Sequence, residues 1–240
     1  EKLIDSRQVF TIVNTVELDR ACEKIKSLVE YYNSECLPNR EVTDDSLKRL
    51  GFSVEEWAYG RGWGINGSQE KEFFAMLRSI KARRNAILII RNFGYVYDTN
   101  TNIPQLIEMM IDTYKYCENS LVYLFFVGRT GRIPAEIMPL FTTLEFDLPT
   151  EDELKELVLQ IFENEGVKDK SLAEPCALAV KGLRFVGAER AVNIAILHGN
   201  KKNPVNFEKL YAQKADLVKK SEILEYVTNT ETVNDLGGMV

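Results

Sequence analysis

Arg91 and Asn92 stand where this sequence could carry hydrolytic chemistry. They follow residues 85–90, a run with the apolar composition of a buried strand. A magnesium-dependent nucleotide hydrolase ends such a strand in Asp-Glu, whose carboxylates hold the metal and polarise water. Arginine and asparagine supply no such carboxylates. The sequence therefore predicts that this strand end positions or binds something rather than hydrolysing it.

A second strand end lacks the residues that hold a phosphate. The first apolar run, residues 9–13, continues as Asn-Thr-Val-Glu-Leu-Asp-Arg over residues 14–20, and the first glycine of the chain is Gly51. A phosphate-binding loop needs glycines so that its backbone N–H groups can converge, followed by Lys-Ser/Thr. The pair Lys26-Ser27 falls deep in a predicted helix with no glycine before it. We therefore expect no phosphate loop.

Four polar residues follow apolar runs at what would be their carboxyl ends: Arg91, Asn92, Arg129 and Arg132. Ligands of open α/β sheets bind at that edge, so these residues are candidates for a residual anion or partner site. The alternative, which we favour, is a set of solvated loop arginines paired with acids.

A glycine-rich segment, residues 60–67, invites a dinucleotide-binding interpretation. Its spacing is poor, and no acidic residue stands at the end of a third strand. We predict instead a turn that exposes Trp63, which makes Trp63 a candidate partner contact.

Other patterns receive structural interpretations. Asp98, Asn100 and Asn102 resemble the start of a calcium loop, but its glycine and glutamate positions hold other residues, so a helix cap is expected. His198 is the single histidine, so a histidine metal cluster is excluded. We expect it at the C-terminus of a helix, where the helix dipole favours it. The lysines of residues 201–220 fit a solvated helix face.

Composition narrows the class of protein. The 240 residues are 45% hydrophobic and 28% charged, as in globular proteins, and no apolar run approaches the roughly 20 residues of a membrane span. With 30 basic and 36 acidic residues, the net charge of −6 disfavours nucleic-acid binding. No Cys-x-x-Cys pair occurs, so we expect reduced thiols at the four cysteines, Cys22, Cys36, Cys117 and Cys176.

Strand and helix patterns alternate over the first 148 residues. Near-continuous apolar strands indicate a parallel sheet covered on both faces. The fold predicted is an α/β three-layer sandwich with a mostly parallel five-stranded sheet, in which the stretch 33–45 forms a loop. The strands are expected at residues 8–14, 54–59, 85–91, 121–127 and 141–147, and the helices at 16–33, 68–83 and 102–117.

Only helical patterns follow, over residues 149–227, and they predict a small helical lid subdomain. Thr150 and Glu153 have the spacing of a capping box, in which each side chain satisfies a free amide of a helix start. The helices are expected near 151–165, 170–181, 187–198 and 206–219. Residues 228–240 are polar and glycine-ended, as in a linker.

This layout resembles an AAA+ ATPase module. Residues 143–154 are similar to the junction in which an edge strand runs through Leu-Pro into the first lid helix, and residues 182–190 are similar to the segment that opens the third lid helix. More specifically, the chain resembles the degenerate N-terminal AAA-like domain of two-part AAA+ ATPases of cyanobacteria, plastids, other bacteria and phages. The features that match are Arg7, Trp57, Asn92, residues 221–226 and the Gly-Gly ending at 235–239.

The resemblance implies where the chemistry of the parent protein lies. Its ATP and magnesium would bind in a following domain beyond Val240, with no cofactor in this chain. The implied partners are the chain's own downstream AAA domain, neighbouring subunits and a protein substrate, with no membrane. The implied location is the cytoplasm or plastid stroma. We therefore expect a non-catalytic regulatory or assembly domain, with a loader-like binding subunit or a divergent nucleotide hydrolase as alternatives.

Overall fold

The structure is a computed structural model that describes residues 2–39, 45–94, 103–131 and 133–228. Its contacts divide the chain into two compact units, Glu1–Asp147 and Leu148–Val240. Each unit has its own hydrophobic core, so each is described by itself.

Unit 1 is built on one six-stranded sheet in the order β3-β2-β4-β5-β1-β6. Five strands run parallel, as predicted, and the two-residue strand β3 adds an antiparallel edge beside β2. The carboxyl ends of β1, β4 and β5 consequently meet at one edge of the sheet. The strands are β1 (Phe10–Asn14), β2 (Ser53–Ala58), β3 (Gly62–Trp63), β4 (Ala86–Arg91), β5 (Val122–Gly128) and β6 (Phe141–Glu145).

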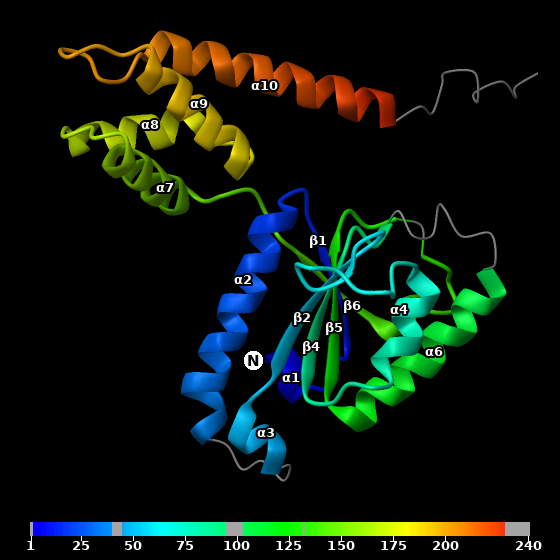
Figure 1. The fold of residues 1–240 in the computed structure, drawn as a ribbon. Helices are drawn as coiled ribbons and strands as arrows, with labels where there is room; N and C mark the ends of the chain where they lie inside the picture. Colours follow the sequence, from blue (N-terminus) through cyan, green and yellow to red (C-terminus); the bar gives the residue numbers. More distant parts are fainter. Residues whose placement is uncertain (1, 40–44, 95–102, 132, 229–240) are drawn as a thin grey trace, which may run out of the picture. The chain divides into compact units, whose positions relative to one another are not determined.

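Helices cover both faces of the sheet, α2 on one side and α4 and α6 on the other (Figure 1). The two faces need this cover because β4 and β5 are apolar along almost their whole length. Unit 1 contains helices α1 (Lys2–Asp5), α2 (Leu18–Tyr31), α3 (Asp45–Leu50), α4 (Phe73–Ile80) and α6 (Ile103–Ser120), with short helical turns at Tyr32–Cys36, Leu37–Asn39 and Met138–Leu140.

The predicted loop at residues 33–45 is wrong for its first part. The helix that begins as α2 continues as a π-helical turn and a 3-10 turn through Asn39. Tyr32 and Leu37 are buried in the core, and their burial keeps this polar stretch helical. The half-buried Asn33 adds side-chain hydrogen bonds to the backbone of Phe52, a contact that the composition of the stretch does not reveal.

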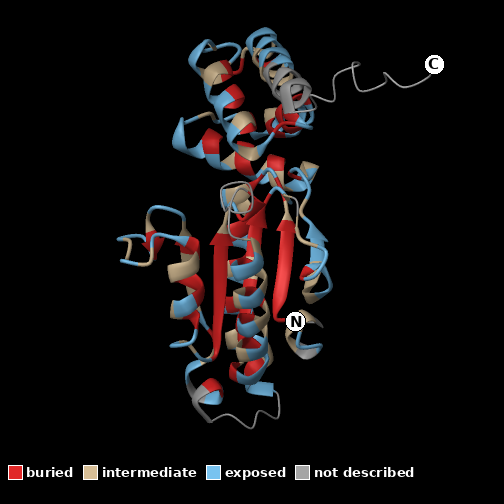
Figure 2. Ribbon diagram, turned by 90° about the vertical axis from the view of Figure 1, so that its right-hand side faces the viewer, coloured by how far each residue is buried: buried red, intermediate tan, exposed pale blue. Residues whose placement is uncertain are grey.

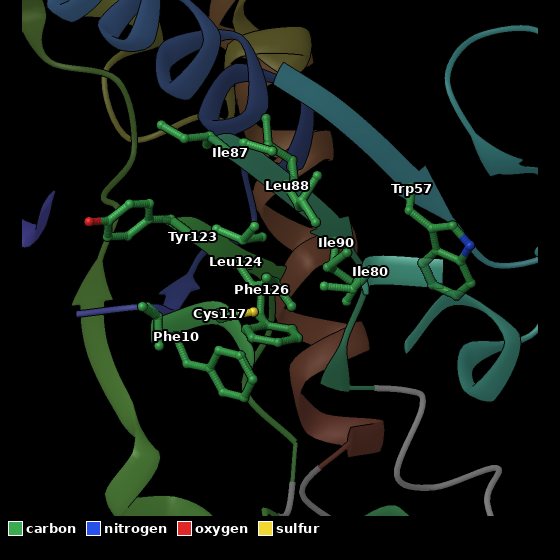
Figure 3. Packing of buried hydrophobic residues seen from close by; sticks show 14 of the residues in the cluster. Phe10, Trp57, Ile80, Ile87, Leu88, Ile90, Cys117, Tyr123, Leu124 and Phe126 are labelled. Carbon is green, nitrogen blue, oxygen red and sulfur yellow. The ribbon is translucent and has the colours of Figure 1, made fainter. Parts of the chain in front are cut away.

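The core of unit 1 lies between the sheet and its helices, where the side chains of Phe10, Leu88 and Phe126 are fully enclosed (Figure 3). The rings of Phe10 and Phe126 meet edge to face with centroids 5.3 Å apart, a favourable aromatic arrangement. Buried residues concentrate in the strands and on the inward sides of the helices (Figure 2). This packed core holds the strand ends in place, and with them the polar residues Arg91, Asn92 and Arg129.

Unit 2 is entirely helical. Thr150 and Glu153 form the predicted capping box: Thr150 Oγ1 accepts from Glu153 N at 3.3 Å, and Glu153 Oε2 accepts from Thr150 N at 2.8 Å. Among the described residues of either unit, no helix is long and apolar enough to cross a membrane. The helices of unit 2 are α7 (Glu151–Asn164), the turn Lys170–Leu172, α8 (Ala173–Val180), α9 (Phe185–Leu197) and α10 (Phe207–Thr228).

Candidate functional site

The junction between β1 and α2 is three residues long, because β1 ends at Asn14 and α2 begins at Leu18. Thr15 N donates to Gly128 O at 3.1 Å, which ties the junction to the end of β5. Thr15 Oγ1 accepts from Glu17 N at 2.9 Å and closes a tight turn. Two backbone amides of the junction are therefore bonded within the protein, one to β5 and one to Thr15, at the position where a phosphate loop would present its amides.

Acidic residues stand at the start of α2. Glu17 is the buried N-cap residue, and Asp19 lies in the first turn. Carboxylates are stabilised by the positive end of a helix dipole, which is also the feature that attracts phosphate groups. This donor set differs from the one a magnesium triphosphate needs, because negative charge already occupies the helix start and neither glycine nor lysine stands in the junction.

Arg91, at the carboxyl end of β4, links two other elements. Its Nη1 bonds Glu56 Oε1 in β2 at 2.9 Å, and its Nη2 bonds Asp19 Oδ1 in α2. Burial alone would lower the pKa of Arg91, but the hydrogen bonds to Asp19 and Glu56 outweigh it and raise the pKa above its ordinary value. The guanidinium thus forms an ionic bridge across the sheet edge, where a hydrolase would hold a metal ion.

Glu56 is the centre of this charge cluster. Besides Arg91 it accepts from Arg61 Nη2 at 2.9 Å and Lys26 Nζ at 3.0 Å, and its side chain is only 13% exposed. Burial alone raises the pKa of Glu56, but the hydrogen bonds from Lys26, Arg61 and Arg91 outweigh it and lower the pKa to about 2. A carboxylate shared among three cations is a fixed internal counter-ion, and it has no free oxygen for acid–base catalysis.

Cys22 lies beside the cluster on α2. Burial raises the pKa of its thiol to about 12, even though the nearby charge of Arg91 acts in the opposite direction. A thiol with that pKa carries no appreciable thiolate near neutral pH, so it is not an activated nucleophile.

The ends of β4 and β5 meet closely, and this contact brings Asn92 beside Gly128 and the following Arg129. Asn92 N donates to Val127 O at 2.8 Å. Asn92 has a φ of +55°, and a Cβ added to Gly128 would stand 3.2 Å from Asn92 Cα. Arg129 is exposed and makes no ion pair with the described residues. Arg132 lies outside the described residues.

The prediction that Trp63 is exposed is wrong. Its ring is buried, its Nε1 donates to Ser79 Oγ at 3.0 Å, and the Arg83 guanidinium stacks 4.1 Å from the ring centroid. Pairing of β3 with β2 draws the side chain inward. The exposed apolar residue of this turn is Ile65, whose exposed fraction is 93%.

The structure describes four of the five predicted site residues and separates them by environment. Arg91 is paired with Asp19 and Glu56. Asn92 and Arg129 are exposed at the carboxyl edge of the sheet, and Trp63 packs against α4. The sequence analysis did not identify Glu56, which organises the cluster. Two signals could have found it: an acidic residue inside a predicted strand, and an arginine at the end of the next strand in the sequence.

The structure describes one of two further sequence patterns. Asp98, Asn100 and Asn102, the predicted helix cap, lie outside the described residues. His198 is the C-terminal cap residue of α9, as predicted. Within the ranges that the structure describes, no group of three or more His, Cys, Asp or Glu residues is arranged to hold a metal ion.

Comparison with known families assigns most of this chain to one family. Residues 1–146 match the SpoVK-like AAA ATPase, N-terminal domain, family. The chain belongs to this family. A curated relative of this AAA domain, the AAA domain-containing protein ycf46 of Trieres chinensis, is 21% identical over 245 residues, which cover 99% of this chain and 45% of the relative. The chain therefore spans less than half the length of the curated relative it matches.

Two solved structures are similar to this chain. A single-residue variant of RuvB from Thermotoga maritima superposes with a TM-score of 0.50 at 15% identity, over 100% of this chain and 75% of RuvB. Domain III of the replication initiation protein DnaA from Thermotoga maritima gives 0.47 at 12% identity, covering 91% of this chain and 89% of that domain. The RuvB likeness confirms the predicted α/β fold of the SpoVK-like domain.

Proposed function

We propose that this chain is a non-catalytic AAA-like domain that regulates or assembles a larger AAA+ ATPase. The observation that carries the proposal is the charge cluster at the carboxyl edge of the sheet. Glu17 lies at the start of α2, and Arg91 bridges Glu56 and Asp19. An incoming triphosphate would meet carboxylates at the helix start, and its magnesium would meet a guanidinium in place of acidic ligands.

Two comparisons support the proposal that this chain is part of a larger AAA+ ATPase. The family is defined as an N-terminal domain of AAA ATPases, and the chain covers only 45% of its curated relative. We therefore propose three segments: an AAA-like domain at 1–148, a helical lid at 149–227 and a linker at 228–240. ATP and magnesium would bind in the following domain. The partners of this chain would be that domain and neighbouring subunits.

Calorimetric titration with Mg-ATP tests the absence of a nucleotide site. The isolated 240-residue chain is expected to give no saturable heat up to millimolar nucleotide. A longer protein that includes the downstream domain serves as the positive control and is expected to bind. Micromolar binding of Mg-ATP by the isolated chain would overturn the proposal in favour of a divergent nucleotide hydrolase.

A second experiment tests the regulatory role. The longer protein is compared with a truncation that lacks residues 1–227, by steady-state ATP hydrolysis and by subunit number in sedimentation. We expect the truncation to retain hydrolysis while its rate or its subunit number changes. If both quantities stay the same, the chain neither regulates nor assembles its parent.

A further inference from the structure

Strand β6 is an edge of the sheet that the described chain leaves open. It pairs with β1 on one side, and Phe146 N continues that pairing by donating to Asn14 O at 3.0 Å. Residues along a parallel strand alternate in the side to which their backbone groups point. Leu144 and Phe146 therefore point their N–H and C=O groups at β1, whereas Thr143 and Glu145 point theirs outward.

This edge carries few of the usual protections. Edge strands normally carry charged side chains, above all lysine, or a proline or a bulge that discourages further pairing. The sequence of β6 is Phe-Thr-Thr-Leu-Glu, in which Glu145 is the single charged residue and no lysine or proline occurs, and its pairing with β1 is regular from Phe141 to Glu145. Thr143, Leu144 and Glu145 are exposed. The backbone of β6 is thus a ready template for one more strand.

A cavity of about 340 Å³ opens beside this edge, on the face of the sheet that α2 covers. Its walls are mostly apolar, and the lining also includes Lys24 and residues 144–146, of which Glu145 turns its side chain to the other face of the sheet. Leu28 of α2 and Leu144 of β6, which are 54% and 40% exposed, leave apolar surface accessible at this site. Further lining residues are Val13, Ile25 and Phe125.

The two faces of the edge differ in chemistry. Leu144 and Phe146 belong to the cavity face. The side chain of Glu145 alternates with them onto the opposite face, where its Oε2 accepts from Asn14 Nδ2 at 2.8 Å, and the exposed Asp147 follows two residues later. A strand added to β6 would place alternate side chains on these two faces. Apolar residues would enter the cavity side, and basic residues would face the two carboxylates.

We propose that β6 and the cavity form a docking site for an extended peptide segment of another protein, in which apolar residues alternate with lysine or arginine. Backbone hydrogen bonds to Thr143 and Glu145 would supply affinity, and the cavity and the carboxylates of Glu145 and Asp147 would supply specificity. A second copy of β6 fits less well, because it would bring further carboxylates and no basic residue.

A labelled ten-residue peptide of alternating valine and lysine is the probe, measured by fluorescence anisotropy with the full 240-residue chain. Its controls are a peptide of five valines followed by five lysines and an alternating valine–glutamate peptide. Saturable binding of the alternating valine–lysine peptide, with both controls at least tenfold weaker, is expected. Equal binding of the block peptide, preference for the glutamate peptide, or no saturable binding would overturn the proposal.

Residue-resolved amide exchange locates the bound peptide. At saturation, the outward amides of Thr143 and Glu145 should exchange at least tenfold more slowly, whereas Leu144, already bonded to β1, should change little. Binding that leaves Thr143 and Glu145 unprotected would contradict docking on the edge. Concentration-dependent dimerisation that protects the same amides without peptide would replace the proposal with self-pairing.

Two variants provide matched tests. Thr143→Pro removes an outward N–H and should weaken the valine–lysine peptide about tenfold, whereas Thr143→Ala keeps the N–H and should change affinity less than twofold. Asp147→Lys keeps the backbone edge intact and should weaken the same peptide about threefold while strengthening the valine–glutamate peptide. If Asp147→Lys leaves both affinities unchanged, the proposed charge recognition is wrong.

Discussion

The starts of α2 and α7 show two ways in which this chain begins a helix. At α7, Thr150 and Glu153 cap each other's amides, so four consecutive residues contain the whole signal. At α2, the N-cap residue Glu17 makes no capping side-chain hydrogen bond, and Asp19 in the first turn is held by Arg91, which lies 72 residues away. Helix α7 therefore begins at a signal within four neighbouring residues, whereas long-range ionic contacts help to position α2.

The difference explains why the two sites respond differently to sequence change. A capping box contributes about 1 kcal/mol and involves partners that are close even in the unfolded chain. The α2 cluster depends on elements that meet only when the sheet is complete, because Glu56 lies in β2 and Arg91 in β4. Loss of a shared buried charge therefore costs more than loss of a cap.

The largest effect is expected for Glu56→Ala. Removing this carboxylate leaves Lys26, Arg61 and Arg91 without their shared counter-ion, and the free energy of unfolding of unit 1 should fall by about 4 kcal/mol. Urea unfolding followed by tryptophan fluorescence isolates this unit, because both tryptophans of the chain lie within it.

Glu55→Ala is the matched control. Glu55 is the neighbouring acid on β2, and its side chain is 36% exposed and paired with Arg83 alone among the described cations. It should cost about 1 kcal/mol. If the two substitutions destabilise unit 1 equally, the cluster has no special role in holding α2 against the sheet.

The acid sensitivity of unit 1 should depend on the same carboxylate. The folded-state pKa of Glu56 is lowered to about 2, so its contribution is present above the ordinary glutamate pKa and is lost as pH falls toward 2. The difference in free energy of unfolding between the wild type and Glu56→Gln should shrink by up to about 3 kcal/mol between pH 5 and pH 2. A difference that stays constant over this interval would contradict the assigned charge state.

The smallest effect is expected at the start of α7. Thr150→Ala should lower the free energy of unfolding of unit 2 by about 1 kcal/mol, and Thr150→Ser, which keeps a capping hydroxyl, should change it by less than half of that. Far-UV circular dichroism should record the change while the tryptophan transition of unit 1 stays in place. A shift of that transition would mean that the α7 cap also stabilises unit 1.

Local sequence signals predicted much of this architecture. The five parallel strands follow from apolar runs bounded by polar residues, and Thr150–Glu153 follows from capping chemistry. Local sequence patterns do not predict the structure where a side chain is held by residues far away in the sequence. Glycines around Trp63 indicate an exposed turn, but Ser79 and Arg83, 16 and 20 residues further on, bury the ring. Arg91 carries no sequence sign that it pairs with Asp19.

The central claim is that the chain's own charges occupy the place of a nucleotide's phosphates and metal. Backbone amide chemical shifts of residues 15–20 test it most directly, recorded while Mg-ATP is added to millimolar concentration. The account predicts that these amides show no saturable shift. Saturable shifts confined to residues 15–20, with a micromolar dissociation constant, would show that a triphosphate binds at the start of α2 and would contradict it.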